Sequence, residues 1–159
     1  MAVERFGFDP VALGKMFLLI GLTLIFVQGF FVRRFVGRIG ENTMAFIGII
    51  CGFISFLIIS HSFNHTIFYG GLFLMSSGVA LISPTLTALT SLHSSDAEQG
   101  FHIGVFRSSG SMARAFGPML AGLAYFFYGS KVAYLLGAFL LVLPLLIMAS
   151  IAKPQKKEV

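Results

Sequence analysis

Long apolar runs alternate with short polar or basic segments along the whole chain. Five runs are long enough to cross a hydrocarbon core about 30 Å thick, at about 1.5 Å of rise per helical residue. We place these spans near residues 11–32, 43–60, 67–92, 104–128 and 132–151, followed by a tail at 152–159. The pattern predicts an all-α integral membrane protein with about five transmembrane helices, in a single transmembrane domain over 1–159.

Local signals refine these helices. Asp9 followed by Pro10 is a good helix start, a capping residue before proline in the first turn, and Asn42 or Thr43 would cap the second helix in the same way. The third and fourth spans exceed a perpendicular crossing, so we expect them to tilt or to extend beyond the core. Each internal proline removes one helical hydrogen bond, and we expect kinks at three of them: Pro84, Pro118 and Pro144.

Composition makes lipid the main partner of this chain. Hydrophobic residues make up 57% and charged residues 11%, with a mean hydropathy of +0.91. A soluble domain usually carries about 25% charged residues, so the surface must face a bilayer. Glu4, Arg5 and Asp9 stand where the apolar region of a cleavable signal would be, so the helices themselves are expected to direct insertion.

The basic residues indicate orientation, although a net charge of +5 and a pI near 9.7 could also indicate nucleic-acid binding. They cluster beside apolar spans, as orientation signals do, so we expect no nucleic-acid partner. With five crossings, eight basic residues fall on one face: Arg33, Arg34, Arg38, Arg107, Arg114, Lys153, Lys156 and Lys157. Three fall on the other: Arg5, Lys15 and Lys131. The prediction is a cytoplasmic C-terminus and an N-terminus outside.

Catalytic and metal chemistry find little support. Cys51 is the only cysteine, which excludes an internal disulfide and a cysteine-based zinc cage. His61 and His65 could chelate a metal if they were helical, but no third ligand is near, and an exposed loop pair is the better interpretation. The Ser108–Gly110 triplet lacks the context of a hydrolase. We therefore expect no enzyme, no cofactor and no metal site, and we discount an intramembrane enzyme.

Small residues and basic residues mark two further segments. Between the first and second spans, the stretch 29–41 reads as a tight basic loop, with Gly29 at the helix end. Later, small residues and prolines recur along the third and fourth spans, which lets membrane helices approach closely. These candidates for helix packing or for a cytoplasmic gate are Gly29, Arg33, Arg34, Arg38, Gly78, Pro84, Gly100, Gly104, Arg114, Gly117 and Pro118.

This second segment resembles a known transporter family. The run Glu98-Gln-Gly100, then Gly104, then Ala113-Arg-Ala-Phe-Gly-Pro118 and Ala121-Gly122 resembles the tenth-to-eleventh helix region of major facilitator superfamily transporters. The branch it resembles most is that of drug:proton antiporters, which includes tetracycline efflux pumps. The opening residues 4–10, with Gly14, Gly21 and Gln28-Gly29, are similar to the family's eighth helix and the outer loop before it. The resemblance covers essentially the whole chain, as helices eight to twelve.

The resemblance implies a partial C-terminal half of the family's fold, with the substrate bound between halves near the midplane. The basic loop departs from the pattern, because Arg33 stands where an acidic residue would be expected, so no carboxylate-dependent latch is assigned there. The six acids all fall in the expected loops or tails: Glu4, Asp9, Glu41, Asp96, Glu98 and Glu158. The family resemblance implies that proton-sensing carboxylates and a core arginine would sit in the first half of the fold, outside this sequence.

A few polar residues in the spans could line a substrate path: Gln28, Ser76, Ser83, Thr87, Ser108 and Ser111. Serine and threonine in membrane helices more often bond their own backbone or a neighbouring helix. Arg114 either snorkels to headgroups or acts on a neighbouring helix, by capping its carbonyls or closing the inner gate.

The predicted function is transport of small molecules, with proton-coupled efflux of drugs or other organic compounds implied by the resemblance. This portion alone is not expected to transport, because it lacks the partner half. The alternative is a small non-transporting membrane protein that associates with or regulates a full-length transporter. The family branch points to a bacterial inner membrane.

Overall fold

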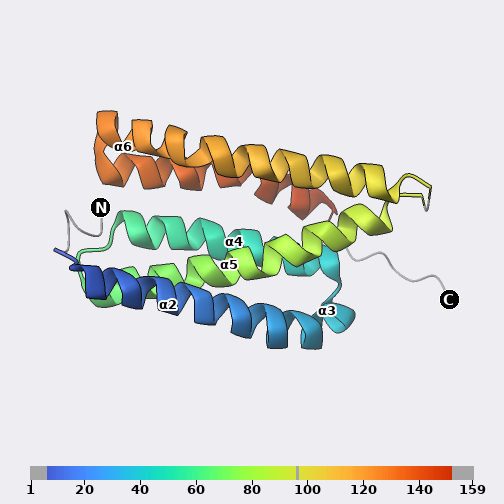
Figure 1. The fold of residues 1–159 in the computed structure, drawn as a ribbon, viewed down its shortest axis with the longest axis horizontal. Helices are drawn as coiled ribbons and strands as arrows, with labels where there is room; N and C mark the ends of the chain where they lie inside the picture. Colours follow the sequence, from blue (N-terminus) through green and yellow to red (C-terminus); the bar gives the residue numbers. More distant parts are fainter. Residues whose placement is uncertain (1–6, 96, 152–159) are drawn as a thin grey trace.

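The computed structural model describes residues 7–95 and 97–151, which form a bundle of helices running side by side (Figure 1). The all-helical fold agrees with the sequence prediction. The helices are α2 (Pro10–Phe26), the π-helix η1 (Val27–Val32), α3 (Arg33–Ile39), α4 (Glu41–Ser60), α5 (His65–Leu92) and α6 (Gln99–Ile151).

Within the described residues, four continuous helical stretches are long and apolar enough to cross a membrane: Pro10–Ile39, Glu41–Ser60, His65–Leu92 and Gln99–Ser150. The last would be about 80 Å long if straight, far more than a bilayer needs. It reverses at Gly129, whose φ of 78° and ψ of 173° are not helical. We call residues 99–128 the first arm of α6 and residues 130–151 its second arm. With this reversal the described chain makes five passes.

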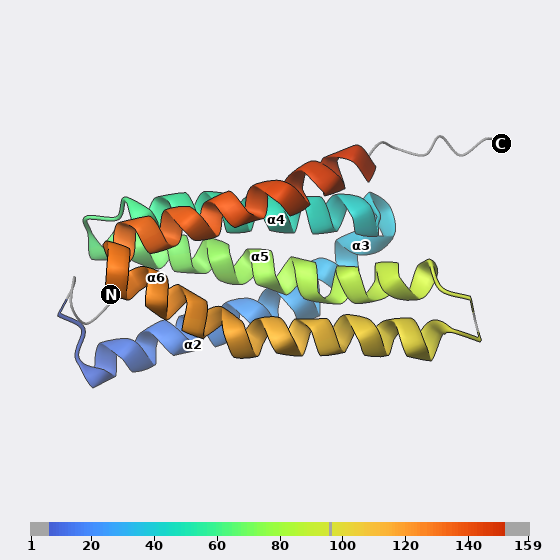
Figure 2. The same cartoon turned by 90° about the horizontal axis from the view of Figure 1, so that it is seen from above.

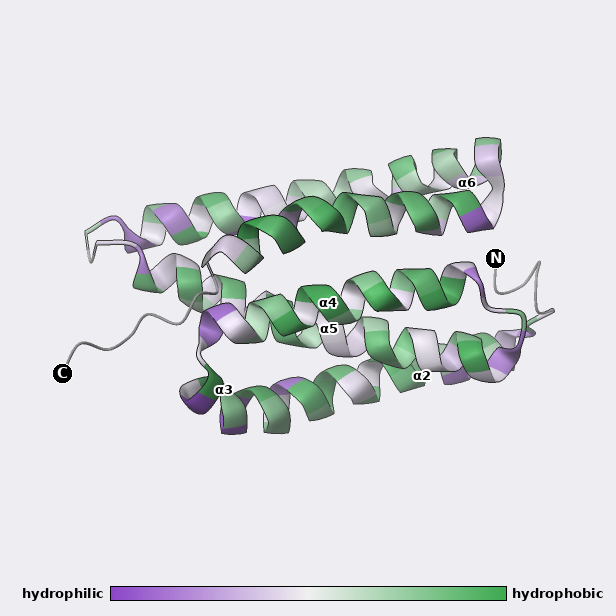
Figure 3. Ribbon diagram, turned by 180° about the vertical axis from the view of Figure 1, so that it is seen from behind, coloured by the Kyte–Doolittle hydropathy of each residue, from purple (hydrophilic) through white to green (hydrophobic). Residues whose placement is uncertain are grey.

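The passes are arranged around a central pair of helices. Figure 1 shows α4 and α5 in the middle of the bundle, with α2 on one side and α6 on the other. The second arm of α6 lies along α4, and the first arm lies beside α5 (Figure 2). We name the two ends of the bundle by their turning glycines, the Gly40 end and the Gly129 end. Hydrophilic colouring gathers at these ends, and hydrophobic colouring dominates between them (Figure 3).

A close approach of backbones joins α4 to α5 through glycines. A Cβ atom placed on Gly78 would lie 2.7 Å from the carbonyl oxygen of Gly48 and 3.0 Å from the amide nitrogen of Gly52. One placed on Gly48 would lie 2.7 Å from Cγ1 of Ile82. Such backbone contact is how membrane helices associate, because lipid gives no hydrophobic drive for them to pair.

Apolar clusters extend this pair outward at both ends. Near the Gly129 end, Phe8 is buried and stacks on His65 and Tyr69, with ring centroids 5.3 and 5.8 Å apart. Ser60, at the end of α4, donates a hydrogen bond of 3.2 Å to the carbonyl of Lys131 at the start of the second arm. These contacts fix the segment before α2 and the α6 reversal against the central helices.

The helix starts are partly as predicted. Asp9 caps α2, since its Oδ1 accepts a 2.7 Å hydrogen bond from the amide of Ala12. The prediction for the second helix is wrong. Gly40, with a φ of 84°, occupies the N-cap position, no side chain caps α4, and Asn42 and Thr43 lie inside its first turn. A glycine in this conformation turns the chain so sharply that the cap falls before the polar residues.

The basic loop expected at 29–41 is also corrected. Residues from Gly29 to Ile39 are helical, in η1 and then α3, and the reversal is confined to Gly40. Arg33, Arg34 and Arg38 are therefore exposed residues of a helix that ends at the turn. Basic side chains and glycines at a helix end have the composition of a loop, which is why the sequence alone misplaced the boundary.

The glycine contact yields a stability prediction. Gly78→Ala should lower the free energy of unfolding by about 1–3 kcal/mol relative to Gly14→Ala, because its methyl group meets fixed backbone atoms. Gly14, on α2, has open space where its Cβ would be, so Gly14→Ala shows the intrinsic helix-propensity gain alone. Thermal unfolding of the detergent-solubilised protein, followed by size exclusion, measures both. Equal midpoints for the two variants would contradict the close contact.

Candidate functional site: a polar stripe on α6

The first arm of α6 is the least covered helix of the bundle. Every residue from 111 to 123 is exposed, including large apolar side chains such as Met112, Phe116 and Leu120. Over 111–123, this arm presents most of its surface to lipid, water or further protein. The side chains on this surface therefore decide whether lipid, water or protein can lie against the arm.

One face of this arm is small or polar, and the other is large and apolar. Small and polar residues recur with alternating steps of four and three, which places them on one side of an α-helix. We call this face the polar stripe; it consists of Gly100, Gly104, Arg107, Ser111, Arg114, Pro118, Ala121 and Tyr125. The bulky residues Val105, Met112 and Leu123 fall on the opposite face. A face with two arginines is poorly suited to lipid tails.

Arg114 carries a charge far along the arm. It lies fifteen residues after Gln99, which is about 22 Å of helix rise. Its Nη2 donates a 3.2 Å hydrogen bond to Oγ of Ser111, and the Ser111 hydroxyl donates 3.0 Å to the carbonyl of Arg107. Its guanidinium lies over Gly110, whose missing side chain leaves the space: a Cβ there would be 3.4 Å from Nη1. Arg114 thus bends back along its own helix, toward the Gly40 end.

The partner seen for Arg114 in the described residues is on its own helix. Capping of a neighbouring helix's carbonyls, one of the roles expected for it, is not found in the described part of the chain. The bent-back conformation has the direction that snorkelling would take.

Two hollows lie on this arm. The first, of about 390 Å³, is a groove near the Gly40 end. It brings together three residues predicted from the sequence, Gly100, Gly104 and Ser108, beside Phe101, Val105, Ser109 and Met112. Small residues open the groove, and apolar side chains form its rim.

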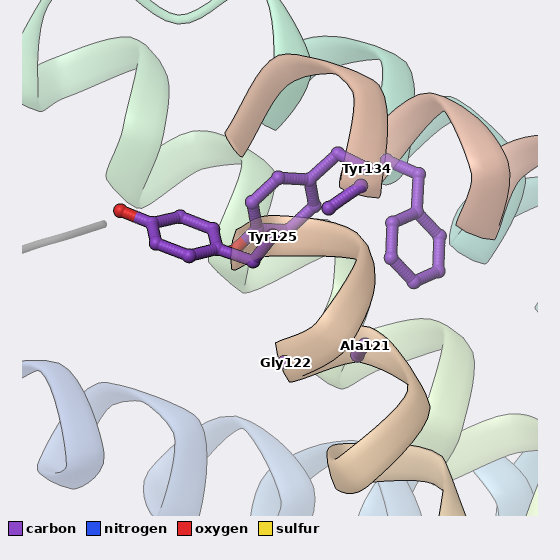
Figure 4. Close-up of a pocket in the computed structure, with 6 residues that line it drawn as sticks. Ala121, Gly122, Tyr125 and Tyr134 are labelled. Atoms are coloured by element: carbon purple, nitrogen blue, oxygen red, sulfur yellow. The ribbon is translucent and has the colours of Figure 1, made fainter. Parts of the chain in front are cut away.

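The second hollow, of about 350 Å³, lies inside the α6 hairpin near Gly129. Ala121, Gly122 and Tyr125 come from the first arm, Ala133 and Tyr134 from the second arm, and Phe56 from α4. Figure 4 shows Tyr125 and Tyr134 approaching each other from the two arms, above Ala121 and Gly122. The volume is in the range of small-molecule sites, and the walls are mainly aromatic. The sequence analysis missed it, because residues from three passes meet there.

Most of the predicted hydroxyl groups bond their own helix. Ser76 is buried and donates 2.8 Å to the carbonyl of Leu72, and Thr87 donates 3.0 Å to the carbonyl of Ser83. Ser111 does the same within α6. This is the alternative that the sequence analysis considered for serines and threonines in membrane helices. Burial separates Ser76 from the exposed Ser83, Ser108 and Ser111.

Gln28 and Gly29 lie in η1, and both are exposed. A π-turn bonds residues five apart, so it stacks Val27 above Val32, and both are buried against α4 and α5. The turn thereby leaves Gln28 on the open side. Short π segments inside α-helices often occur at functional sites, but nothing in the sequence marked this one.

The described carboxylates lie at helix ends. Asp9 precedes α2, Glu41 begins α4, and Glu98 precedes α6. Glu98 accepts a 3.1 Å hydrogen bond from Ser95, and Gln99 donates one to Ser91, which joins α5 to α6 across the turn. The predicted segment 98–100 thus straddles a helix start instead of lying wholly in a loop. His61 follows α4 and His65 begins α5, so this pair does not share a helical face.

Two patterns in the sequence could have predicted parts of this arrangement but were not used. Gly48 and Gly52 have the small-x-x-x-small spacing of close helix contacts, as the glycine contact with Gly78 shows. The four-three spacing of the polar stripe was also present in the sequence, and five of its eight residues belong to the family motif: Gly100, Gly104, Arg114, Pro118 and Ala121.

Comparison with known proteins assigns the chain to a family. The profile of the Major Facilitator Superfamily matches residues 1–159, and the chain belongs to that family. It is therefore a multi-pass membrane protein of a family whose members are transporters.

Particular relatives are mammalian. The chain is 34% identical over 154 residues to "Major facilitator superfamily domain-containing protein 10" of Bos taurus, covering 96% of this chain and 33% of that protein. With the Homo sapiens protein of that name it shares 30% over 151 residues, covering 95% and 33%. It also resembles the crystal structure of the human organic anion transporter MFSD10 (TETRAN), with a TM-score of 0.86 and 31% identity, covering 92% of this chain and 34% of that one.

The chain spans about a third of the length of these relatives. Their source gives no support to the expected bacterial inner membrane.

The π-turn gives a second prediction. Deleting Gly29 should convert η1 to α-helix and rotate α3 by about 100° against α2, which pulls Val32 away from Met44 and Leu81. We expect a lower unfolding temperature for the deletion than for Gly29→Ala, whose methyl group meets nothing within 4 Å. Identical melting of the two variants would mean that the π-turn does not set the packing register.

Proposed function

We propose that this chain forms helices eight to twelve of a small-molecule transporter, and that the remaining helices of the fold supply the facing wall of the transport path. The observation that carries the proposal is the polar stripe, a cationic face on a helix whose residues 111–123 are all exposed. Its membership of the family and its coverage of one third of its relatives support the same interpretation. Alone, the chain lacks half of a path and does not transport.

Organic anions are the substrate class that we propose. The solved relative is described as an organic anion transporter, and Arg107 and Arg114 give this chain the complementary charge. Efflux driven by a proton gradient remains the proposed energy source, on the resemblance to drug:proton antiporters. The carboxylates that bind the coupling proton belong to the remaining helices, since those described here lie at helix ends.

Within this chain, we assign the path to the polar groups that stay accessible. These are Gln28 on η1, Ser83 and Thr87 on α5, and Ser108 and Ser111 on α6. Ser76 is excluded by its burial and its backbone bond. Arg33, Arg34 and Arg38, at the Gly40 end, are proposed as gate residues on the cytoplasmic side.

The orientation makes a third prediction. With the Gly40 end cytoplasmic, a C-terminal epitope tag should be reached by antibody after permeabilisation of the cells and not before. A tag inserted between Ser62 and Phe63, in the turn at the opposite end, is the matched control and should react in intact cells. The reverse pattern would overturn the orientation and the gate assignment with it.

Transport is tested on the full-length product in its own membrane. A C-terminal tag should identify a band well above 17.3 kDa, or a short band that co-purifies with a separately made first half. Vesicles containing that product should take up or release a fluorescent organic anion such as carboxyfluorescein in response to a pH gradient. A lone 17.3 kDa product with no partner half would overturn the proposal in favour of a non-transporting membrane protein that regulates a transporter.

A further inference from the structure

The charge on Arg114 has no described counter-ion. The described acids, Asp9, Glu41 and Glu98, lie at helix ends, and the polar partner of Arg114 in the described residues is the neutral hydroxyl of Ser111. A cation this far along a membrane helix is costly to keep, so its presence needs a compensating interaction. Among the described residues, the interaction that offsets the cost of this charge is the hydrogen bond to Ser111.

The donors of Arg114 are organised and open. A guanidinium has five N–H donors in a rigid fork, and Ser111 occupies one of them. The Ser111 hydroxyl is itself oriented by donating to the carbonyl of Arg107, so its lone pair faces Arg114. Arg114 is exposed, which leaves its other donors available to an incoming group. A planar fork of this kind matches two oxygens of one anionic group.

Gly110 provides the space that this arrangement requires. The guanidinium atoms lie 3.4, 3.7 and 3.9 Å from the position where a Cβ of residue 110 would be. A Cβ alone would make ordinary van der Waals contact with the guanidinium, so only the extra methyl groups of a branched side chain would crowd it. Gly117, one heptad further on the same face, has nothing within 4 Å of the equivalent position.

We propose that Gly110, Ser111 and Arg114 form an anion-binding subsite that holds the sulfonate or carboxylate group of the transported molecule. Arg114 binds the oxygens through paired N–H donors, Ser111 fixes the direction of the guanidinium, and Gly110 gives it room. The subsite rests on the proposed transport of organic anions and locates their charged group on the first arm of α6. Arg107, on the same stripe, adds positive potential one heptad nearer the Gly40 end.

The test uses the purified full-length protein and two probes of one shape, tritiated naphthalene-1-sulfonate and neutral naphthalene-1-sulfonamide. Arg114→Gln should weaken sulfonate binding about tenfold or more and leave sulfonamide binding unchanged, since it removes a charge-assisted contact. The sulfonate affinity of Arg114→Lys should lie between those of the unmodified protein and Arg114→Gln, because lysine keeps the charge but lacks the paired N–H donors of the guanidinium. Gly110→Val should weaken sulfonate binding, and Gly70→Val on α5, where nothing lies within 4 Å of the Cβ position, should not.

If Arg114→Gln weakened the binding of both probes equally, the subsite would be overturned and Arg114 would be a gate or packing residue. Sulfonate binding that is insensitive to Arg114, or absent in the unmodified protein, would overturn it as well. Uptake measurements separate this result from the proposed function. Anion transport that persists in Arg114→Gln with unchanged KM refutes the subsite alone, and Arg114-dependent binding without any transport refutes the proposed function alone.

Discussion

Backbone contact between α4 and α5 is the constraint from which the rest of the bundle follows. Gly48, Gly52 and Gly78 bring the two helices so close that a Cβ on Gly78 would meet backbone atoms of α4. Lipid offers no hydrophobic drive for helices to pair, so close packing of this kind must hold the centre. The other passes are then placed by what this pair leaves exposed: α2 and η1 cover α5, and the second arm of α6 lies along α4 (Figure 2). The first arm is the pass left without cover, and it carries the cationic face.

The helices themselves could be predicted from the sequence because a bilayer imposes one length and one polarity on every span. The predicted helix boundaries were wrong where a segment has the composition of a loop but the conformation of a helix. The segment 29–41 is basic and glycine-rich, yet it is helical up to Gly40, because basic side chains at a helix end can reach water while the backbone stays bonded. Gly129 shows the converse: one residue with a positive φ reverses an otherwise continuous helix, and the gap between spans revealed the break but not its sharpness.

The candidate site was predictable in its residues but not in its geometry. Gly104 and Arg114 were identified from the family motif, and Ser108 and Ser111 as polar residues of the fourth span. All four lie on the first arm of α6. Rotation about the helix axes decides which side chains are covered. It buries Ser76, leaves Ser83 open, and turns Gln28 of η1 outward, and it leaves room for Arg114 to bend back over Gly110. A one-residue π insertion changes such rotation by a large angle, and hydropathy hardly records it. The aromatic hollow of Phe56, Tyr125 and Tyr134 depends on three passes at once.

The central claim is that the polar stripe of α6 faces protein or water, whereas the second arm faces lipid. Spin labels introduced by Ser111→Cys and, separately, by Phe139→Cys, each with Cys51→Ser, test it in the full-length protein in bilayers; Phe139 is 73% exposed on the second arm. Oxygen concentrates in lipid and a nickel chelate stays in water, so their collision rates with each label report its surroundings. The account predicts a much lower ratio of oxygen to nickel collisions at position 111 than at 139. Equal, lipid-like ratios at both positions would contradict it.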